Sequence, residues 1–267
     1  MTHITFKLKK KLRYRLDMTF VSDISNYKSI KKFLSKKIYY GNKEVNISSL
    51  FNVTGTDTSK IVIKSSMNYM DNIGVGLRNI EIIVYGDVGY SFGSKMQSGK
   101  LVLYGNCLDY AASGMKGGMI FIHGNTGKYL GGKPNSSNEG ILDGFIYIKG
   151  NVGQNSIQRM RRGNVIINGN LGDYACEEMI SGSIIVMGRV GNSFAEGIKR
   201  GTIITKEKKI TKDYRLASKA EYNFINFFVN KISKILKLNL FSRKTIISRY
   251  HGHKNNDNLS EIFLFKS

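Results

Sequence analysis

The sequence of 267 residues has no tryptophan, a single proline and only two cysteines, Cys107 and Cys176. Two thiols are too few for a disulfide scaffold or for a cysteine-bound metal cluster. They lie more than three units apart in the repeat described below, about 15 Å at ~4.8 Å per unit. A disulfide spans at most about 7 Å between Cα atoms, so we expect two free thiols and a reducing, cytoplasmic compartment.

Long apolar runs are absent as well. No run reaches the roughly 18 residues that a membrane span needs, so we expect no membrane association. The start, MTHITFKLKKKLRYRLD, is basic but enters no apolar segment, and it therefore predicts no secretion signal. A hydrophobic content of 41% is enough to build a core.

Acidic residues are scarce: 19 Asp and Glu stand against 41 Lys and Arg, which gives a net charge of +22. Residues 1–60 hold 13 basic and 4 acidic residues, residues 61–204 hold 14 and 10, and residues 205–267 hold 14 and 5. The middle of the chain is nearly balanced, and the flanks carry the excess. Such flanks indicate either an anionic partner or the lysine- and asparagine-rich usage of a compositionally biased genome.

Glycine, by contrast, is abundant and periodic. Repeat units begin at Gly86, Gly105, Gly124, Gly150, Gly169 and Gly188, at spacings of 19, 19, 26, 19 and 19 residues. The longer unit carries seven extra residues at 133–139, and a degenerate unit precedes Gly86. A fixed period near 20 residues with short apolar runs predicts an all-β solenoid with one coil per unit, about seven coils in total.

Each position in the unit has a predicted role. The leading glycine and its polar neighbour should turn through left-handed backbone, and the stacked asparagines should form a ladder. Ten residues later comes a core-filling side chain: Met96, Met115, Met160, Met179 or Ile198. A second glycine precedes a short strand whose alternate apolar residues should point inward: Leu101 and Leu103, Ile120 and Ile122, Ile146 and Ile148, Val165 and Ile167, Ile184 and Val186.

The residue between each inward pair is also apolar. These residues form a second stripe, on the opposite face of the same strands: Ile83, Val102, Phe121, Tyr147, Ile166, Ile185 and Ile204. A continuous outward stripe exceeds what a monomer normally exposes, and strands that are apolar on both faces are usually covered on both. We therefore expect this stripe to lie under the flanking segments, under a partner subunit, or under both.

The flanks lack the period and define three regions: a capping segment at 1–60, the solenoid at 61–205, and a helix with a tail at 206–267. In the first region we expect strands at 4–8 and 14–21 and a helix at 24–37. In the last region Ser218 should cap a helix at 219–238. Its buried face should cover part of the stripe, with Phe224, Ile225, Phe228, Ile232, Ile235 and Leu236.

Candidate catalytic and metal-binding residues are few. His251 and His253 form the only histidine pair, without an acidic or cysteine partner at ligand spacing, so a surface loop is the favoured interpretation. Gly74-Val75-Gly76 lacks the context of a dinucleotide site, and GMKGG at 114–118 follows the repeat pattern rather than a phosphate-binding loop. The in-phase tyrosines Tyr110, Tyr129 and Tyr174 are read as a stacked ladder in the core, and His123 is read as structural. We assign no catalytic residue and no metal ligand.

Two features remain as candidates for recognition. Arg159, Arg161 and Arg162 form the densest basic cluster within the repeat, and Lys199 and Arg200 occupy the phase of Arg161 and Arg162 two units later. Stacking should align them along one edge, where they form either a cradle for carboxylates or a solvated surface. The insertion at 133–139 is either a partner contact or a neutral loop.

The glycine repeat resembles the right-handed β-helix at the C-terminal end of glutamate synthase. It is more similar to the third, β-helical subunit of the formylmethanofuran dehydrogenase family, and most similar to the corresponding subunit of the bacterial formyltransferase/hydrolase complex. The residues that carry the resemblance are GMKGG at 114–118, RMRRG at 159–163 and GNLGDYA at 169–175. The opening YRLDMTFV, the passage IYYGNKEVNISSLFNVTG and the closing NLSEIFLF agree as well, whereas Ile80 departs from the glycine pattern.

The resemblance implies a non-catalytic scaffold of a right-handed single-stranded β-helix. In the bacterial complex other subunits transfer a formyl group from formyl-tetrahydromethanopterin to a methanofuran-type carrier and hydrolyse the product to formate. No cofactor is expected in this chain. The carrier has a glutamate-rich tail, so the resemblance implies that Arg159, Arg161, Arg162, Lys199 and Arg200 hold or steer it.

Other functions stay open. The chain can instead be the β-helical subunit of an archaeal tungsten or molybdenum formylmethanofuran dehydrogenase, which reduces CO2 to formylmethanofuran. A self-contained glutamate synthase-like domain and a basic nucleic-acid-binding scaffold are minor alternatives. The split of the basic excess between two flanks disfavours nucleic acid as a partner.

Overall fold

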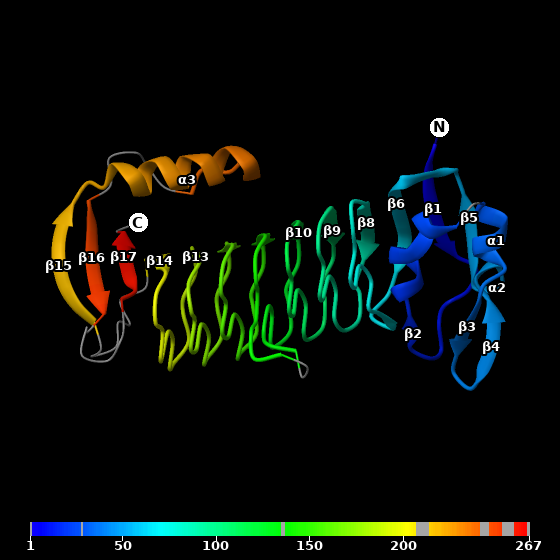
Figure 1. The fold of residues 1–267 in the computed structure, drawn as a ribbon, viewed down its shortest axis with the longest axis horizontal. Helices are drawn as coiled ribbons and strands as arrows, with labels where there is room; N and C mark the ends of the chain where they lie inside the picture. Colours follow the sequence, from blue (N-terminus) through cyan, green and yellow to red (C-terminus); the bar gives the residue numbers. More distant parts are fainter. Residues whose placement is uncertain are drawn as a thin grey trace.

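The fold is described from a computed structural model, for residues 2–27, 29–134, 137–206, 214–240, 246–252 and 259–265. Its main feature is a sheet of thirteen strands in the order β15-β16-β17-β14-β13-β12-β11-β10-β9-β8-β6-β1-β5. From β8 to β14 the strands follow one another in sequence and pair in parallel. Figure 1 shows them side by side along the length of the molecule. The expected β-rich architecture is confirmed in this form.

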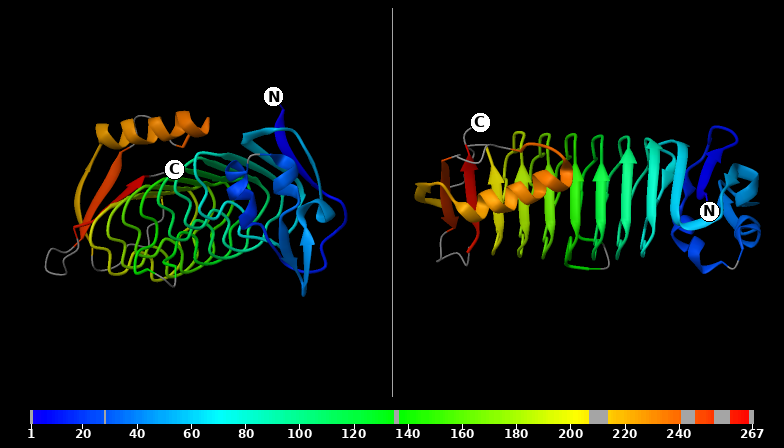
Figure 2. Two further views of the ribbon diagram at one scale, coloured as in Figure 1. Left: turned by 45° about the vertical axis from the view of Figure 1, so that its right-hand side comes forward. Right: turned by 90° about the horizontal axis from the view of Figure 1, so that it is seen from above.

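The parallel strands recur once per repeat unit. Their bounds are β8 Glu81–Gly86, β9 Lys100–Tyr104, β10 Met119–Ile122, β11 Phe145–Ile148, β12 Asn164–Ile167, β13 Ser183–Val186 and β14 Thr202–Thr205. A second line of parallel bridges joins the same phase of successive units, from Val88–Cys107 to Leu171–Val190. The units therefore stack in register on two sides, and Figure 2 shows the loops between strands stacked in the same way.

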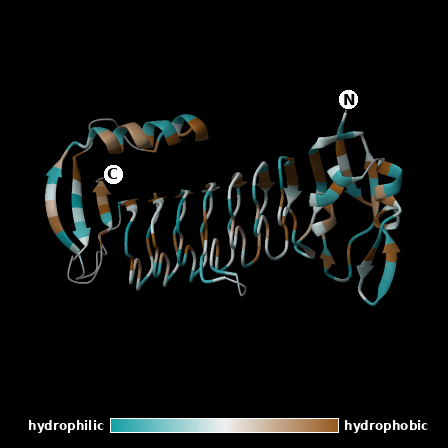
Figure 3. Ribbon diagram, in the orientation of Figure 1, coloured by the Kyte–Doolittle hydropathy of each residue, from teal (hydrophilic) through white to brown (hydrophobic). Residues whose placement is uncertain are grey.

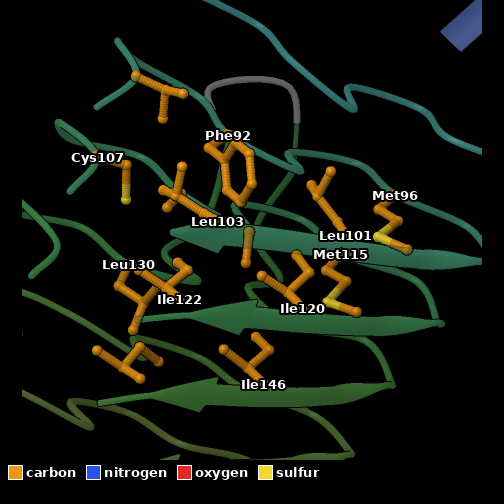
Figure 4. Packing of buried hydrophobic residues seen from close by; sticks show 14 of the residues in the cluster. Phe92, Met96, Leu101, Leu103, Cys107, Met115, Ile120, Ile122, Leu130 and Ile146 are labelled. Atoms are coloured by element: carbon orange, nitrogen blue, oxygen red, sulfur yellow. The ribbon is translucent and has the colours of Figure 1, made fainter. Parts of the chain in front are cut away.

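The core runs through the inside of the stack. The predicted inward pairs are fully buried in all five units, and so are the sulfur-bearing fillers Met96, Met115, Met160 and Met179. Figure 4 shows Leu101, Ile120 and Ile146 aligned from strand to strand, with Met96 and Met115 beside them. In the long unit Ile141 takes the place of the methionine. It lies ten residues after Gly124 when the seven inserted residues are left out of the count, and it too is fully buried.

The leading glycines have a different role from the predicted one. Among them only Gly86 has a positive φ, so left-handed backbone does not explain the others. They lie against the preceding unit instead: a Cβ on Gly105, Gly169 or Gly188 would come within 2.2 to 2.4 Å of the carbonyl oxygen of the glycine one unit earlier. Close stacking of backbone on backbone is what excludes a side chain here.

The polar residue after each leading glycine forms the predicted ladder. The side-chain oxygen of each accepts a hydrogen bond from the backbone N–H one unit later, at 2.7 to 2.8 Å, from Asp87 through Asn106, Asn125 and Asn151 to Asn170. Asn106 and Asn125 also donate from their side-chain amides to the preceding rung. The ladder fixes the register of the stack.

The N-terminal segment packs on the first strands of the stack. It contains β1 His3–Leu8, β2 Leu16–Asp17, a 3-10 helix η1 Thr19–Asn26, α1 Ile30–Leu34, β3 Lys37–Tyr40, β4 Lys43–Asn46, α2 Ile47–Leu50 and β5 Phe51–Thr54. Strand β6 Asp57–Ser66 crosses the predicted boundary at residue 60, and β7 Met70–Asp71 follows it. Strand β1 pairs in parallel with β6, which pairs with β8, so the cap continues the sheet. Aromatic side chains of Phe6, Phe20, Phe33 and Phe51 form its centre.

Two predictions for this segment are wrong in detail. The strand expected at 14–21 is reduced to Leu16–Asp17, because the Asp17 carboxylate accepts from the backbone N–H of Thr19 and turns the chain into η1. The helix expected at 24–37 is a five-residue helix, Ile30–Leu34. Tyr27 is extended, and Ser29 caps the helix by accepting from the N–H of Lys32.

The C-terminal segment adds β15 Tyr214–Ala220, α3 Asn223–Leu236, β16 Ile247–Gly252 and β17 Glu261–Phe265. The helix expected at 219–238 begins later, because residues up to Ala220 pair with β16 in an antiparallel ladder. Ser218 lies in β15 and does not cap the helix. Ile225, Val229 and Ile232 form the buried side of α3, whereas Phe224 and Ile235 are exposed, contrary to the predicted face.

Helix α3 covers the outer face of the C-terminal half of the stack. Its buried residues form a second apolar cluster with Tyr147, Ile166, Ile185 and Ile204 of the stripe and Phe263 of β17. Figure 2 shows α3 lying across the strands on that side, and Figure 3 shows apolar and polar residues alternating along it. No helix formed by the described residues is long and apolar enough to cross a membrane.

Candidate functional site

A basic groove lies where two loops of the stack align. It has a volume of about 700 Å³ and is lined by Arg161, Arg162, Ile180, Ser181, Lys199, Arg200 and Leu259. Four of the five basic residues singled out in the sequence therefore converge. Arg159 does not line the groove.

Backbone stacking puts these side chains together. The N–H of Arg161 donates to Ile141, that of Ile180 to Met160 and that of Lys199 to Met179, at 2.7 to 2.9 Å. Residues in the same phase of three successive units thus lie one above another, about 4.8 Å apart per unit. The N–H of Leu259 donates to the carbonyl of Lys199, which brings the segment before β17 to the end of the groove.

The five basic residues differ in their ion pairs. Arg159 pairs with Glu178 and also donates to the carbonyl of Asn138, and Arg161 pairs with Glu139. For Arg162, Lys199 and Arg200, no acidic partner lies within ion-pair distance among the described residues. These three exposed cations supply the net charge of the groove.

The chemistry of the lining is that of an anion site. Guanidinium groups offer paired N–H donors to carboxylates, and ammonium groups add charge without fixed geometry. Among the described lining residues, Ser181 is the one that carries a hydroxyl, beside two with aliphatic side chains. Such a lining is chemically suited to an acidic group.

A second polar groove was not foreseen from the sequence. It has a volume of about 520 Å³ on another corner of the stack and includes Lys95, Lys133, Ser91 and Tyr110. Ser91 and Tyr110 have positive φ values of 60° and 65° at the same phase of successive units. Each lies five residues after the leading glycine of its unit, and this equal spacing is the sequence signal that could have predicted their alignment.

The predicted ladder of in-phase tyrosines is present only as one stacked pair, and it lies on the surface. Tyr110 and Tyr129 stack at 4.9 Å between ring centroids, with 7° between their planes. Tyr110 and Tyr174 are exposed by 41% and 50%, so the interpretation as a core ladder is wrong. Asn155 holds the phase between Tyr129 and Tyr174 and breaks the stack.

A second stack consists of Tyr85, Tyr104 and His123, with centroid distances of 5.0 and 4.5 Å. Partial burial lowers the pKa of His123, and the nearby charge of Lys149 lowers it further. Both effects favour the neutral imidazole, which suits its place in the stack.

The remaining candidates resolve as follows. Burial raises the pKa of both thiols, and Cys107 and Cys176 are free. Gly74 and Gly76 have φ values of +76° and +66° in the degenerate unit and are corner residues. His251 lies in β16 and contacts the Gly252 carbonyl, whereas His253 is outside the described residues. No group of three or more potential metal ligands occurs in the described part of the chain.

The stripe divides into a covered and an open part. Tyr147, Ile166, Ile185 and Ile204 are at most 5% exposed under α3, within the chain's own packing. Ile83 and Phe121 are only partly buried, with Val102 between them at 6%. Any partner contact of this stripe is thus confined to β8, β9 and β10.

These observations define a class: repeat proteins whose glycine-marked units stack into one long parallel sheet. The GXGXG motif family model matches residues 22–252, and the chain belongs to this family. The structure is similar to a chain in the X-ray crystal structure of the formyltransferase/hydrolase complex (FhcABCD) from Methylorubrum extorquens in complex with methylofuran. The TM-score is 0.86 at 28% sequence identity, with 98% of this chain and 100% of that chain covered. No curated protein matches the sequence.

Proposed function

We propose that this chain is a structural subunit of a formyltransferase/hydrolase complex and that the other subunits of that complex are its partners. The observation that carries the proposal is the likeness to a chain of FhcABCD over 98% of this chain and the whole of that chain, at 28% identity. Both flanks, which carry most of the positive charge, fall within this likeness. It therefore extends beyond the repeat that many unrelated chains can share.

In this role the stack is a right-handed β-helix of about seven coils. Residues 1–60 cap its first coil, residues 61–205 form the coils, and residues 206–267 pack on the far end. The regular in-register stacking on two sides supports this assignment. A stiff rod of this kind suits a scaffold, because each coil contacts only its neighbours and keeps its surface residues at fixed spacing.

The chain contributes binding rather than chemistry to the complex. The groove of Arg161, Arg162, Lys199 and Arg200 offers charge and N–H donors. We assign it, together with Arg159 at its margin, to the acidic tail of a methanofuran-type carrier. Partner subunits then transfer the formyl group from formyl-tetrahydromethanopterin to the carrier and release formate, in the cytoplasm.

Purification of the native complex through a tag on this chain tests the proposal. We expect stoichiometric co-purification of a formyltransferase subunit and an amidohydrolase subunit, identified by mass spectrometry, with formyltransferase/hydrolase activity in the same fraction. A pterin–metal subunit with iron–sulfur partners would assign the chain to a formylmethanofuran dehydrogenase instead. A chain that elutes alone from cells that contain the other subunits would overturn both assignments.

A further inference from the structure

The outer face of β8, β9 and β10 carries an apolar row that the described helices leave uncovered, with Ile83 and Phe121 partly exposed. We propose that it binds an amphipathic helix of a partner subunit, with acidic residues along the borders of that helix. This inference rests on the proposed function, because it takes its partner from the assembled complex.

A single row of apolar residues crosses nine neighbouring strands of the sheet. Strand pairing places in one line Val62, Ile83, Val102, Phe121, Tyr147, Ile166, Ile185, Ile204 and Phe263. From Tyr147 onward the row lies under α3, where its members are at most 5% exposed. The chain supplies a cover for the C-terminal half of the row. In the other half Val62 and Val102 are 5% and 6% exposed through contacts with their neighbours, and Ile83 and Phe121 are only partly buried.

The other half of the row lacks this cover. Ile83 is partly buried, Phe121 reaches only the margin of the α3 cluster, and Met119 on the same face is 45% exposed. In Figure 2 the helix lies over the yellow and green strands and does not reach the cyan ones. Apolar surface gains about 25 cal/mol per Å² on burial, so an open continuation of a covered row favours a second cover of the same kind.

Two rows of side chains border the open face. On one side the stacked rings of Tyr85, Tyr104 and His123 form a wall at the ends of the three strands. On the other side Lys60, Glu81 and Lys100 form a ladder of ion pairs, at 3.1 and 3.0 Å. The ammonium group of Lys100 also lies 5.8 Å from the ring centroid of Phe121.

The charge of these borders selects the occupant. Lys60, Lys64 and Lys100 flank the open part of the row, and the carboxylate of Glu81 offsets only part of their charge. Lys64 lies two residues beyond Val62, on the same side of β6. A partner helix with acidic residues flanking its apolar stripe therefore matches the open face.

The same charges argue against a second copy of this chain as the occupant. Helix α3 is the longest amphipathic helix among the described residues, and its last turns carry Lys231, Lys234 and Lys237. Docked on the open face of another copy, these lysines would face the lysines that flank the row. The length also fits a partner helix: the three strand spacings from β6 to β10 span about 14 Å, which a helix of about 10 residues covers.

Photo-crosslinking in the assembled complex tests the inference. A photoreactive phenylalanine analogue placed at position 83 should crosslink to a peptide of another subunit with apolar residues at helical spacing and flanking acids. The matched control places the same group at Tyr174, which is 50% exposed on a different side of the stack. Crosslinks from position 83 only within this chain, or to a second copy of it, would overturn the inference.

A mutant series separates this inference from the proposed function. Ile83→Glu should lower the yield of assembled complex at least tenfold, whereas Ile83→Leu and Tyr174→Glu should leave it unchanged. Lys64→Glu should weaken assembly more at 50 mM than at 500 mM salt, because the contact is partly electrostatic. Circular dichroism of each free variant shows whether the chain is folded. Normal assembly of a folded Ile83→Glu variant would refute the proposal that this face binds a partner helix. Failure of the wild-type chain to assemble with the other subunits would instead refute the proposed function.

Discussion

At the residue scale, the repeat's glycines serve two physical purposes that look identical in the sequence. The second glycine of each unit, such as Gly163 or Gly182, has a φ near +100° and is needed for its backbone conformation. The leading glycines mostly have ordinary φ values and are needed because a neighbouring carbonyl leaves no room. The spacing identifies both positions, but a spacing pattern does not show how close two backbones approach, so left-handed backbone was expected at the leading position too.

The distinction can be measured with two glycine variants. In Gly169→Ala the new Cβ would lie 2.4 Å from the carbonyl oxygen of Gly150, so we expect destabilisation by about 3 kcal/mol. Gly76→Ala places its Cβ in open space at a φ of +66° and should cost only about 1 kcal/mol of conformational strain. Urea unfolding followed by circular dichroism gives both values. Equal losses would show that close approach is not the dominant constraint at the leading position.

At the scale of elements, the repeat was predictable and the flanks were less so. The strands, their inward residues and the asparagine ladder follow from a period that occurs six times. Flanking elements occur once, and tertiary context decides them: antiparallel pairing with β16 holds residues 214–220 in a strand that helical periodicity had assigned in part to α3. Likewise, the apolar stripe predicted a cover, and α3 provides half of it through Ile225, Val229 and Ile232.

The contribution of this cover is tested by two isoleucines of α3. Ile232 is 3% exposed against the stripe, and its replacement by alanine should cost about 3 kcal/mol through lost burial and a cavity. Ile235 is 46% exposed, and Ile235→Ala should change the free energy of unfolding by less than about 0.5 kcal/mol. Limited proteolysis should cleave near α3 first in the Ile232 variant. Equal stability of the two variants would contradict the observed face of the helix.

At the scale of the whole molecule, the stack sets the spacing of groups from distant parts of the sequence. Arg162 and Arg200 are 38 residues apart in sequence but only two stacked repeat units apart in space, and Leu259 joins them from the C-terminal segment. The period predicted the convergence of the cations. It did not predict that Glu178 and Glu139 would pair with Arg159 and Arg161, since Glu139 comes from the one irregular unit. The charge available to a ligand therefore lies mainly with Arg162, Lys199 and Arg200.

This distribution of charge predicts how the groove responds to mutation. In the assembled complex the double variant Arg162→Glu/Arg200→Glu should raise the KM for the methanofuran-type carrier about tenfold at low salt, with kcat nearly unchanged. The effect should shrink at high ionic strength, where the Debye length falls to about 3 Å at 1 M. Arg189→Glu is the matched control, since Arg189 is exposed on the same stack but lies outside the groove.

Because Arg161 is already paired with Glu139, Arg161→Gln should raise the KM less than either single change at Arg162 or Arg200. A KM that is insensitive to the double charge reversal at low salt would leave the groove without a role in carrier binding, whatever the chain's place in the complex.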